Sequence, residues 1–170
     1  MLGRVESAAI PALRPPRHRV SRHAVSYWTV QVAGVWVIAF PALLMGTTAI
    51  DISGPLRAMI IVAAGALALA SIIGVPRWRY AVHRWESTPE AVYTQTGWFN
   101  VERRIAPVSR IQTVDTERGP LEQLCNLATV TVTTASAKGP LKIAGLDDAT
   151  ADRLVDELTA VAQASPDDAT

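Results

Sequence analysis

The sequence has few of the side chains from which enzyme and redox sites are built. Cys125 is the only cysteine among 170 residues, and the three histidines, His18, His23 and His83, are scattered. A single cysteine excludes an internal disulfide, which fits a reducing compartment. The histidines lack metal-ligand spacing, and the glycines after residue 96 each fit a turn rather than a phosphate-binding loop. We therefore expect no catalytic, metal-binding or cofactor-binding residue, and a protein that is not an enzyme.

A basic surface is also lacking in the C-terminal part of the chain. Residues 77–170 hold ten Lys and Arg against thirteen Asp and Glu, although the whole chain has a net charge of +1. Nucleic-acid-binding domains are basic. We therefore expect no nucleic-acid partner.

Charge is absent altogether from residues 24–50 and 58–76. A helix crosses the hydrocarbon core of a bilayer with roughly 20 apolar residues. The sequence thus predicts a transmembrane hairpin over residues 24–76, with helices at about 26–48 and 55–75. The first stretch is too long for the apolar region of a signal peptide, and no small-residue cleavage site follows it. The lipid bilayer is accordingly the first expected partner.

Arginines flank both ends of the predicted hairpin. They are Arg17, Arg19 and Arg22 before it, and Arg77, Arg79 and Arg84 after it. Basic flanks stay in the cytoplasm, so we expect a two-pass protein of the plasma (inner) membrane with both termini cytoplasmic. Residues 1–23 are expected to form a disordered basic tail. The tail either sets topology only or also attracts anionic headgroups.

Aromatic residues stand at both cytoplasmic ends of the hairpin, where interface anchors belong. Tyr27, Trp28, Trp78 and Tyr80 are predicted to be these anchors.

A narrow face with a four-residue repeat, mostly of small residues, occurs in both apolar stretches. It consists of Gly34, Ile38, Ala42 and Gly46 in the first, and of Ala66, Ala70 and Gly74 in the second. Such a face lets helices approach closely in lipid. It serves either the contact between the two helices or contact with a second membrane protein.

Residues 77–164 show the pattern of a small β domain, and residues 165–170 that of a frayed tail. Six short strands are expected, the first over residues 78–85, with turn signals between them. Asn126 suits a left-handed exit from a short helix over residues 119–126. Ala151, Leu154 and Leu158 belong to an apolar stripe of a C-terminal helix. The pattern predicts an antiparallel β-sandwich or partial barrel capped by a C-terminal α-helix.

Three stretches of this domain carry a resemblance to a known family. They are residues 103–114, 119–124 and 127–132. With the hairpin before them, the chain resembles the bacterial pleckstrin-homology-like proteins of the membrane-flanked type. The resemblance implies a partial barrel closed by a C-terminal helix, and it implies no settled activity. The family carries glycine where Asn126 stands, and a full fold of this kind has seven strands.

Binding of inositol-phosphate lipids is not expected, because the loop after the first predicted strand is flanked by Glu86 and Glu90. Arg103, Arg104 and Arg110 form the main basic cluster, which we expect within one hairpin joined at Pro107. These arginines either form an edge paired to acids, Glu102 and Asp115, or dock an acidic partner peptide.

The preferred hypothesis for function is a non-enzymatic integral membrane protein. Its pleckstrin-homology-like module would mediate protein–protein assembly at the inner leaflet, with another membrane protein or a second copy as partner. The alternative is an accessory subunit in transport, export or resistance to small toxic compounds.

Overall fold

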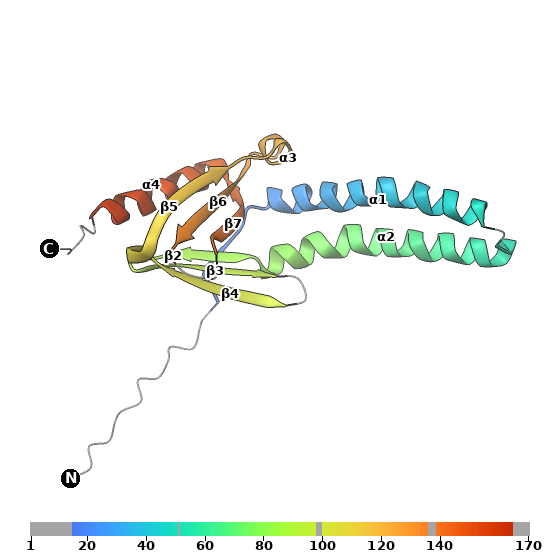
Figure 1. Cartoon of the computed structure of the whole chain (residues 1–170), viewed down its shortest axis with the longest axis horizontal. Coiled ribbons are helices and arrows are strands. Elements are labelled where there is room, and N and C mark those ends of the chain that lie inside the picture. Colours follow the sequence, from blue (N-terminus) through green and yellow to red (C-terminus); the bar gives the residue numbers. More distant parts are fainter. Residues whose placement is uncertain (1–14, 51, 98–99, 136–138, 165–170) are drawn as a thin grey trace, which may run out of the picture.

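The chain folds into a long helical hairpin and a small β domain that is joined directly to one end of it (Figure 1). The computed structural model describes residues 15–50, 52–97, 100–135 and 139–164, with side chains as far as Val161. The predicted tail at residues 165–170 and the first 14 residues lie outside the described residues. The two helices run side by side and turn back at the end farthest from the domain.

The hairpin consists of α1 (His23–Ala49) and α2 (Gly54–Val82). Both helices are long and apolar enough to cross a membrane. The predicted strand at residues 78–85 is wrong over its first five residues, because α2 continues through Pro76 to Val82. The backbone N–H of His83 still donates to the Arg79 carbonyl at 2.8 Å. One helix therefore runs unbroken from the apolar region into the domain.

The two helices contact each other through other positions than the predicted small-residue faces, whose residues are exposed. Trp36 Nε1 donates a hydrogen bond of 2.7 Å to Ser71 Oγ between them. At Gly34, Gly46 and Gly74, by contrast, an added Cβ would meet nothing within 4 Å. The interpretation that these two faces hold the hairpin together is therefore wrong. These positions face away from the partner helix.

The β domain has two antiparallel sheets. The first contains β2 (Arg84–Ser87), β3 (Ala91–Gly97) and β4 (Val101–Pro107), and the second contains β5 (Ile111–Glu117), β6 (Leu127–Thr134) and β7 (Leu141–Asp147). A single 3₁₀ turn, Val108–Arg110, makes the corner between them. The short helix α3 (Pro120–Leu124) links β5 to β6, and Asn126 leaves it with φ 52°, as predicted.

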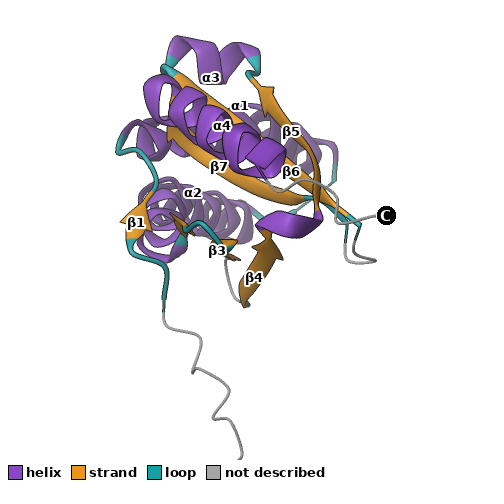
Figure 2. Ribbon diagram, turned by 90° about the vertical axis from the view of Figure 1, so that its left-hand side faces the viewer, coloured by secondary structure: helices purple, strands orange, loops and turns teal. Residues whose placement is uncertain are grey.

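The C-terminal helix α4 (Asp148–Ala164) lies across the second sheet (Figure 2). Its predicted apolar stripe is confirmed, because Ala151, Leu154 and Leu158 are all buried in the main core. Val92 of the first sheet and Val130 of the second meet them there. The two sheets and α4 thus enclose one hydrophobic core, as the predicted sandwich requires.

A seventh strand comes from before the hairpin. Residues His18–Arg19 form β1, which pairs with β2 at the edge of the first sheet. The backbone N–H of Arg17 also donates to the buried carboxylate of Glu86 at 3.2 Å. The prediction of a disordered tail is therefore wrong for the end of that segment. Two residues are too few to show a strand period, and their pairing partner lies far along the chain.

The start of α1 is seated on β7. Val20, Ala24 and Trp28 form a second buried cluster with Leu127, which we call the junction cluster. Gly145 of β7 has φ +78°, and a Cβ there would lie 2.9 Å from the Ala24 Cβ. The backbone N–H of Ser21 donates to the Gly145 carbonyl at 2.8 Å. The absence of a side chain at residue 145 is what lets the helix approach the strand.

Replacing Gly145 with alanine should loosen this junction. Left-handed backbone costs an alanine about 1–2 kcal/mol, and the clash with Ala24 should add about 1–3 kcal/mol. Gly139→Ala is the matched control, since Gly139 has φ +73° but nothing within 4 Å of an added Cβ. Thermal unfolding in detergent should show a clearly lower midpoint for Gly145→Ala than for Gly139→Ala. Equal midpoints would contradict the close approach.

Candidate functional site

The prediction that Trp28 anchors the protein among lipid headgroups is wrong. Its side chain is 1% exposed and lies in the junction cluster. The Arg79 guanidinium lies over its ring, 4.4 Å from the centroid, and the His83 ring centroid lies 5.1 Å away. A tryptophan near the start of an apolar stretch can face either lipid or a docked domain. In this protein the β domain covers Trp28. Truncating a buried aromatic of this kind typically costs about 3–5 kcal/mol.

The other predicted anchors divide into two groups. Tyr27 and Tyr80 are half-buried against the junction cluster, and the Arg19 guanidinium lies 5.7 Å from the centroid of the Tyr80 ring. Trp78 is 54% exposed on α2, two residues beyond Pro76. Trp78 therefore has the exposure that an interface anchor needs, and its role stays a prediction.

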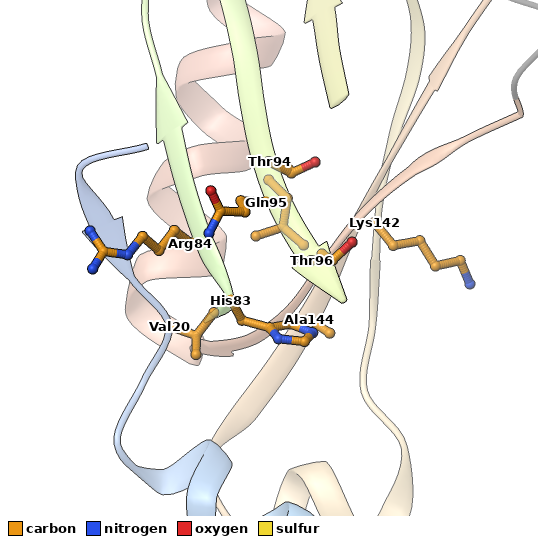
Figure 3. A pocket seen from close by; sticks show the side chains of 9 residues that line it. Val20, His83, Arg84, Thr94, Gln95, Thr96, Lys142 and Ala144 are labelled. Carbon is orange, nitrogen blue, oxygen red and sulfur yellow. The ribbon is translucent and has the colours of Figure 1, made fainter. Parts of the chain in front are cut away.

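His83 links α2 to the first sheet and is 7% exposed. Its Nδ1 lies 2.8 Å from the Arg79 carbonyl oxygen, which can only accept, so Nδ1 carries the proton. Burial lowers the pKa of His83 below its usual value of 6.5, the hydrogen bond to Arg79 raises it, and the Arg79 charge lowers it. Figure 3 shows His83 between Val20 and Ala144, where only about 10 Å³ remains unfilled.

The edge strand β4 carries an exposed surface that we call the β4 face. It consists of Val101, Arg103 and Ile105, which alternate along one side of the strand. Val101 is 49% and Ile105 45% exposed. Arg103 Nε donates to Gln95 Oε1 at 2.9 Å, and Gln95 Nε2 donates to the Val82 carbonyl at 3.0 Å. Gln95 thus connects the β4 face to the end of α2.

The expected hairpin of the basic cluster is wrong, because β4 and β5 belong to different sheets. Arg104 faces the opposite side of β4 from Arg103. It donates to the Pro140 carbonyl at 2.8 Å and lies 3.4 Å from a Glu102 oxygen, one of its two predicted acids. Arg110 is exposed at the corner after β4. The three arginines therefore do not form one compact basic surface.

The short helix α3 exposes apolar side chains at its surface. Leu124 is 81% and Leu121 41% exposed. Glu122 holds the helix in place by accepting from the Gly119 backbone N–H at 2.9 Å and from Thr129 Oγ1 at 2.8 Å. Figure 1 shows α3 at the end of the domain from which the hairpin leaves. These leucines are therefore exposed at the end of the domain that is nearest to the hairpin.

Within the described ranges, no group of three or more His, Cys, Asp or Glu side chains is arranged to hold a metal ion. One hollow in the described part of the chain has a volume of about 390 Å³. It lies between the β1–β2 edge and α4, and its lining includes Arg19, Trp85 and Arg153.

The chain matches known proteins over most of this architecture. The family model described as "Bacterial PH domain" matches residues 30–162. The UPF0699 transmembrane protein YdbS of Bacillus subtilis (strain 168) is 35% identical over 100 residues. That match covers 59% of this chain and 62% of the relative, so less than two thirds of the relative's length is spanned. No solved structure matches. These matches confirm the resemblance to the bacterial pleckstrin-homology-like proteins, the predicted fold class and a location in the membrane.

The buried His83 should make stability depend on pH. Because its folded pKa lies below 6.5, protonation favours the unfolded chain. The stabilisation is complete above pH 6.5 and is lost as the pH falls through the folded pKa, with a slope of at most about 1.4 kcal/mol per pH unit. Thermal midpoints measured in detergent from pH 8 to pH 5 should fall more steeply for the native protein than for His83→Gln. Parallel curves would contradict a buried neutral histidine.

Proposed function

The chain belongs to the bacterial PH domain family, and we propose that it is a non-enzymatic membrane protein whose PH-like domain assembles with other proteins at the inner leaflet. The partner is another membrane protein or a second copy of this chain. The observation that carries the proposal is the β4 face, an exposed apolar surface around an arginine on a sheet edge with which no described strand pairs.

The composition of the β4 face supports protein recognition. Exposed apolar side chains beside an arginine are typical of the centre of protein–protein interfaces. Within the described residues, β4 pairs only with β3, so its other edge is open to strand addition. Unprotected strand edges are otherwise avoided because they promote aggregation. An edge with apolar side chains therefore favours a partner that covers it.

A rigid connection between hairpin and domain supports assembly at the membrane surface. The continuous α2 and the junction cluster both fix the domain relative to the hairpin. The β4 face is consequently held at one height and angle above the bilayer. Limiting the orientations of a binding surface lowers the entropy lost on association.

The pairing of β1 with β2 supports the proposed two-pass topology. β1 precedes the hairpin and β2 follows it, yet their residues pair directly, for example His18 with Trp85. Both segments must therefore lie on one side of the bilayer that the hairpin crosses. The arginines beside the hairpin favour the cytoplasm as that side.

The outward small-residue positions Gly34 and Gly74 favour the second candidate function. They leave room for a close helix contact within the membrane. An accessory subunit of an export or resistance system would use such a contact.

Reporter fusions test the proposed topology. A fluorescent protein fused after Thr170 should fluoresce, because it folds in the cytoplasm, and alkaline phosphatase inserted after Ser53 should be active, because it is exported. The reverse pattern at both positions would contradict the orientation. A fusion after Ser53 that is cytoplasmic, together with a cytoplasmic Thr170, would contradict the spanning hairpin.

Photocrosslinking in living cells tests the β4 face. A photoreactive residue at Ile105 should give a discrete adduct, whereas one at Asp156, exposed on α4, should not. Val101→Asp in the same chain should reduce the Ile105 adduct several-fold, because it places an uncompensated charge at the contact. Adducts of equal yield at both positions, or an Ile105 adduct insensitive to Val101→Asp, would contradict the proposal.

Two differently tagged copies of the chain distinguish a second copy from another protein in that experiment.

Replacing residues 33–72 by an unrelated two-helix hairpin, which keeps Trp28 and Pro76, tests the second candidate function, that of an accessory subunit. The adduct survives the replacement if the β4 face alone makes the contact. It is lost if the membrane helices select the partner.

A further inference from the structure

A hollow of about 290 Å³ lies where α2 leaves the apolar region of the hairpin. Its described lining residues are Val75, Arg79, His83 and Gly97. Val75 and Arg79 are four residues apart on one face of α2, His83 follows the last residue of that helix, and Gly97 ends β3. We call this space the interface hollow. The uncharged stretch ends at Pro76, so Arg79 lies only about 4.5 Å farther along the helix axis, at headgroup depth.

Arg79 places a positive charge in the lining of the interface hollow. No acidic side chain among the described residues forms an ion pair with it. Its side chain is half-buried, and its guanidinium is stacked on Trp28. The ion pairs among the described residues involve Arg17, His23, Arg104, Arg118 and Lys142, and none involves Arg79. A partly desolvated cation is stabilised by an anion that enters from outside.

The other lining groups define which anion fits. His83 is neutral near pH 7, because burial keeps its pKa below the usual value. It therefore adds neither repulsion nor a second charge. Val75 offers an apolar wall on the bilayer side, and Gly97 offers no side chain. A ligand that is anionic at one end and apolar at the other, with the charge at headgroup depth, matches this arrangement.

We propose that the interface hollow binds one anionic phospholipid, whose phosphate contacts the Arg79 guanidinium above Trp28 while its acyl-glycerol part lies along Val75. The stacked, planar guanidinium is pre-oriented for two parallel hydrogen bonds to phosphate oxygens. The site shares no residue with the β4 face, although Gly97 of its lining is the strand partner of Val101 in that face. A purely structural role for Arg79, as a cation at the end of α2, is the competing explanation.

Lipid retention measured by native mass spectrometry separates the two explanations. The full chain is reconstituted in nanodiscs of phosphatidylcholine with phosphatidylglycerol and then released in detergent. The native protein should retain one phosphatidylglycerol. Arg79→Gln should lower the retained fraction roughly tenfold, the effect of losing one charge-assisted contact. Arg77→Gln is the matched control, because Arg77 is exposed on the same turn and donates to the Ile73 carbonyl.

A second variant guards against misfolding of Arg79→Gln. Val75→Trp fills the hollow and leaves Arg79 unchanged, so it should also reduce retention. An excess of soluble glycerol phosphate should not displace the lipid, since it lacks the acyl part. Equal retention in the native protein and Arg79→Gln would overturn the proposal. So would equal losses in Arg77→Gln and Arg79→Gln, which indicate surface charge alone, or displacement by glycerol phosphate, which indicates a soluble phosphate as ligand.

Discussion

The close approach of the first turn of α1 to Gly145 determines how the two halves of this protein are joined. A helix start and a strand of the second sheet touch at van der Waals distance, with Val20 and Trp28 filling the space around them. A flexible linker between an anchor and its domain would let the two reorient. Here the anchor is part of the domain's hydrophobic interior, so the membrane and the domain share one rigid frame.

Three surfaces take their position from that frame. The β4 face is held beside the end of α2 through Gln95, the leucines of α3 lie beside the start of α1, and the interface hollow opens between α2 and β3. Each is near the plane in which the helices leave the domain. The surface that we propose for protein contact and the one that we propose for lipid therefore both keep a fixed position relative to the hairpin.

The sequence was sufficient for the elements that carry a strong local signal. Two stretches without charge predicted α1 and α2, and the spacing of Ala151, Leu154 and Leu158 predicted α4 and its buried side. The sequence was insufficient where a structural feature depends on a contact with residues far along the chain. β1 is recognised only through its pairing with β2, and Arg104 binds a carbonyl 36 residues away. Trp28 illustrates a different limit, since an aromatic residue beside an apolar stretch gives the same pattern whether lipid or protein surrounds it. That no acidic side chain of the described residues pairs with Arg79 likewise depends on tertiary contacts, which the sequence pattern does not show.

The position of β1 has a consequence for biosynthesis. Arg17 and its hydrogen-bond partner Glu86 are 69 residues apart, and the whole hairpin lies between them. At about 5–20 residues per second, the ribosome needs roughly 3–14 seconds to make that interval. The first sheet cannot be completed while the hairpin is still emerging. Maturation of the domain is therefore ordered in time, because the whole hairpin is synthesised before β1 can pair with β2.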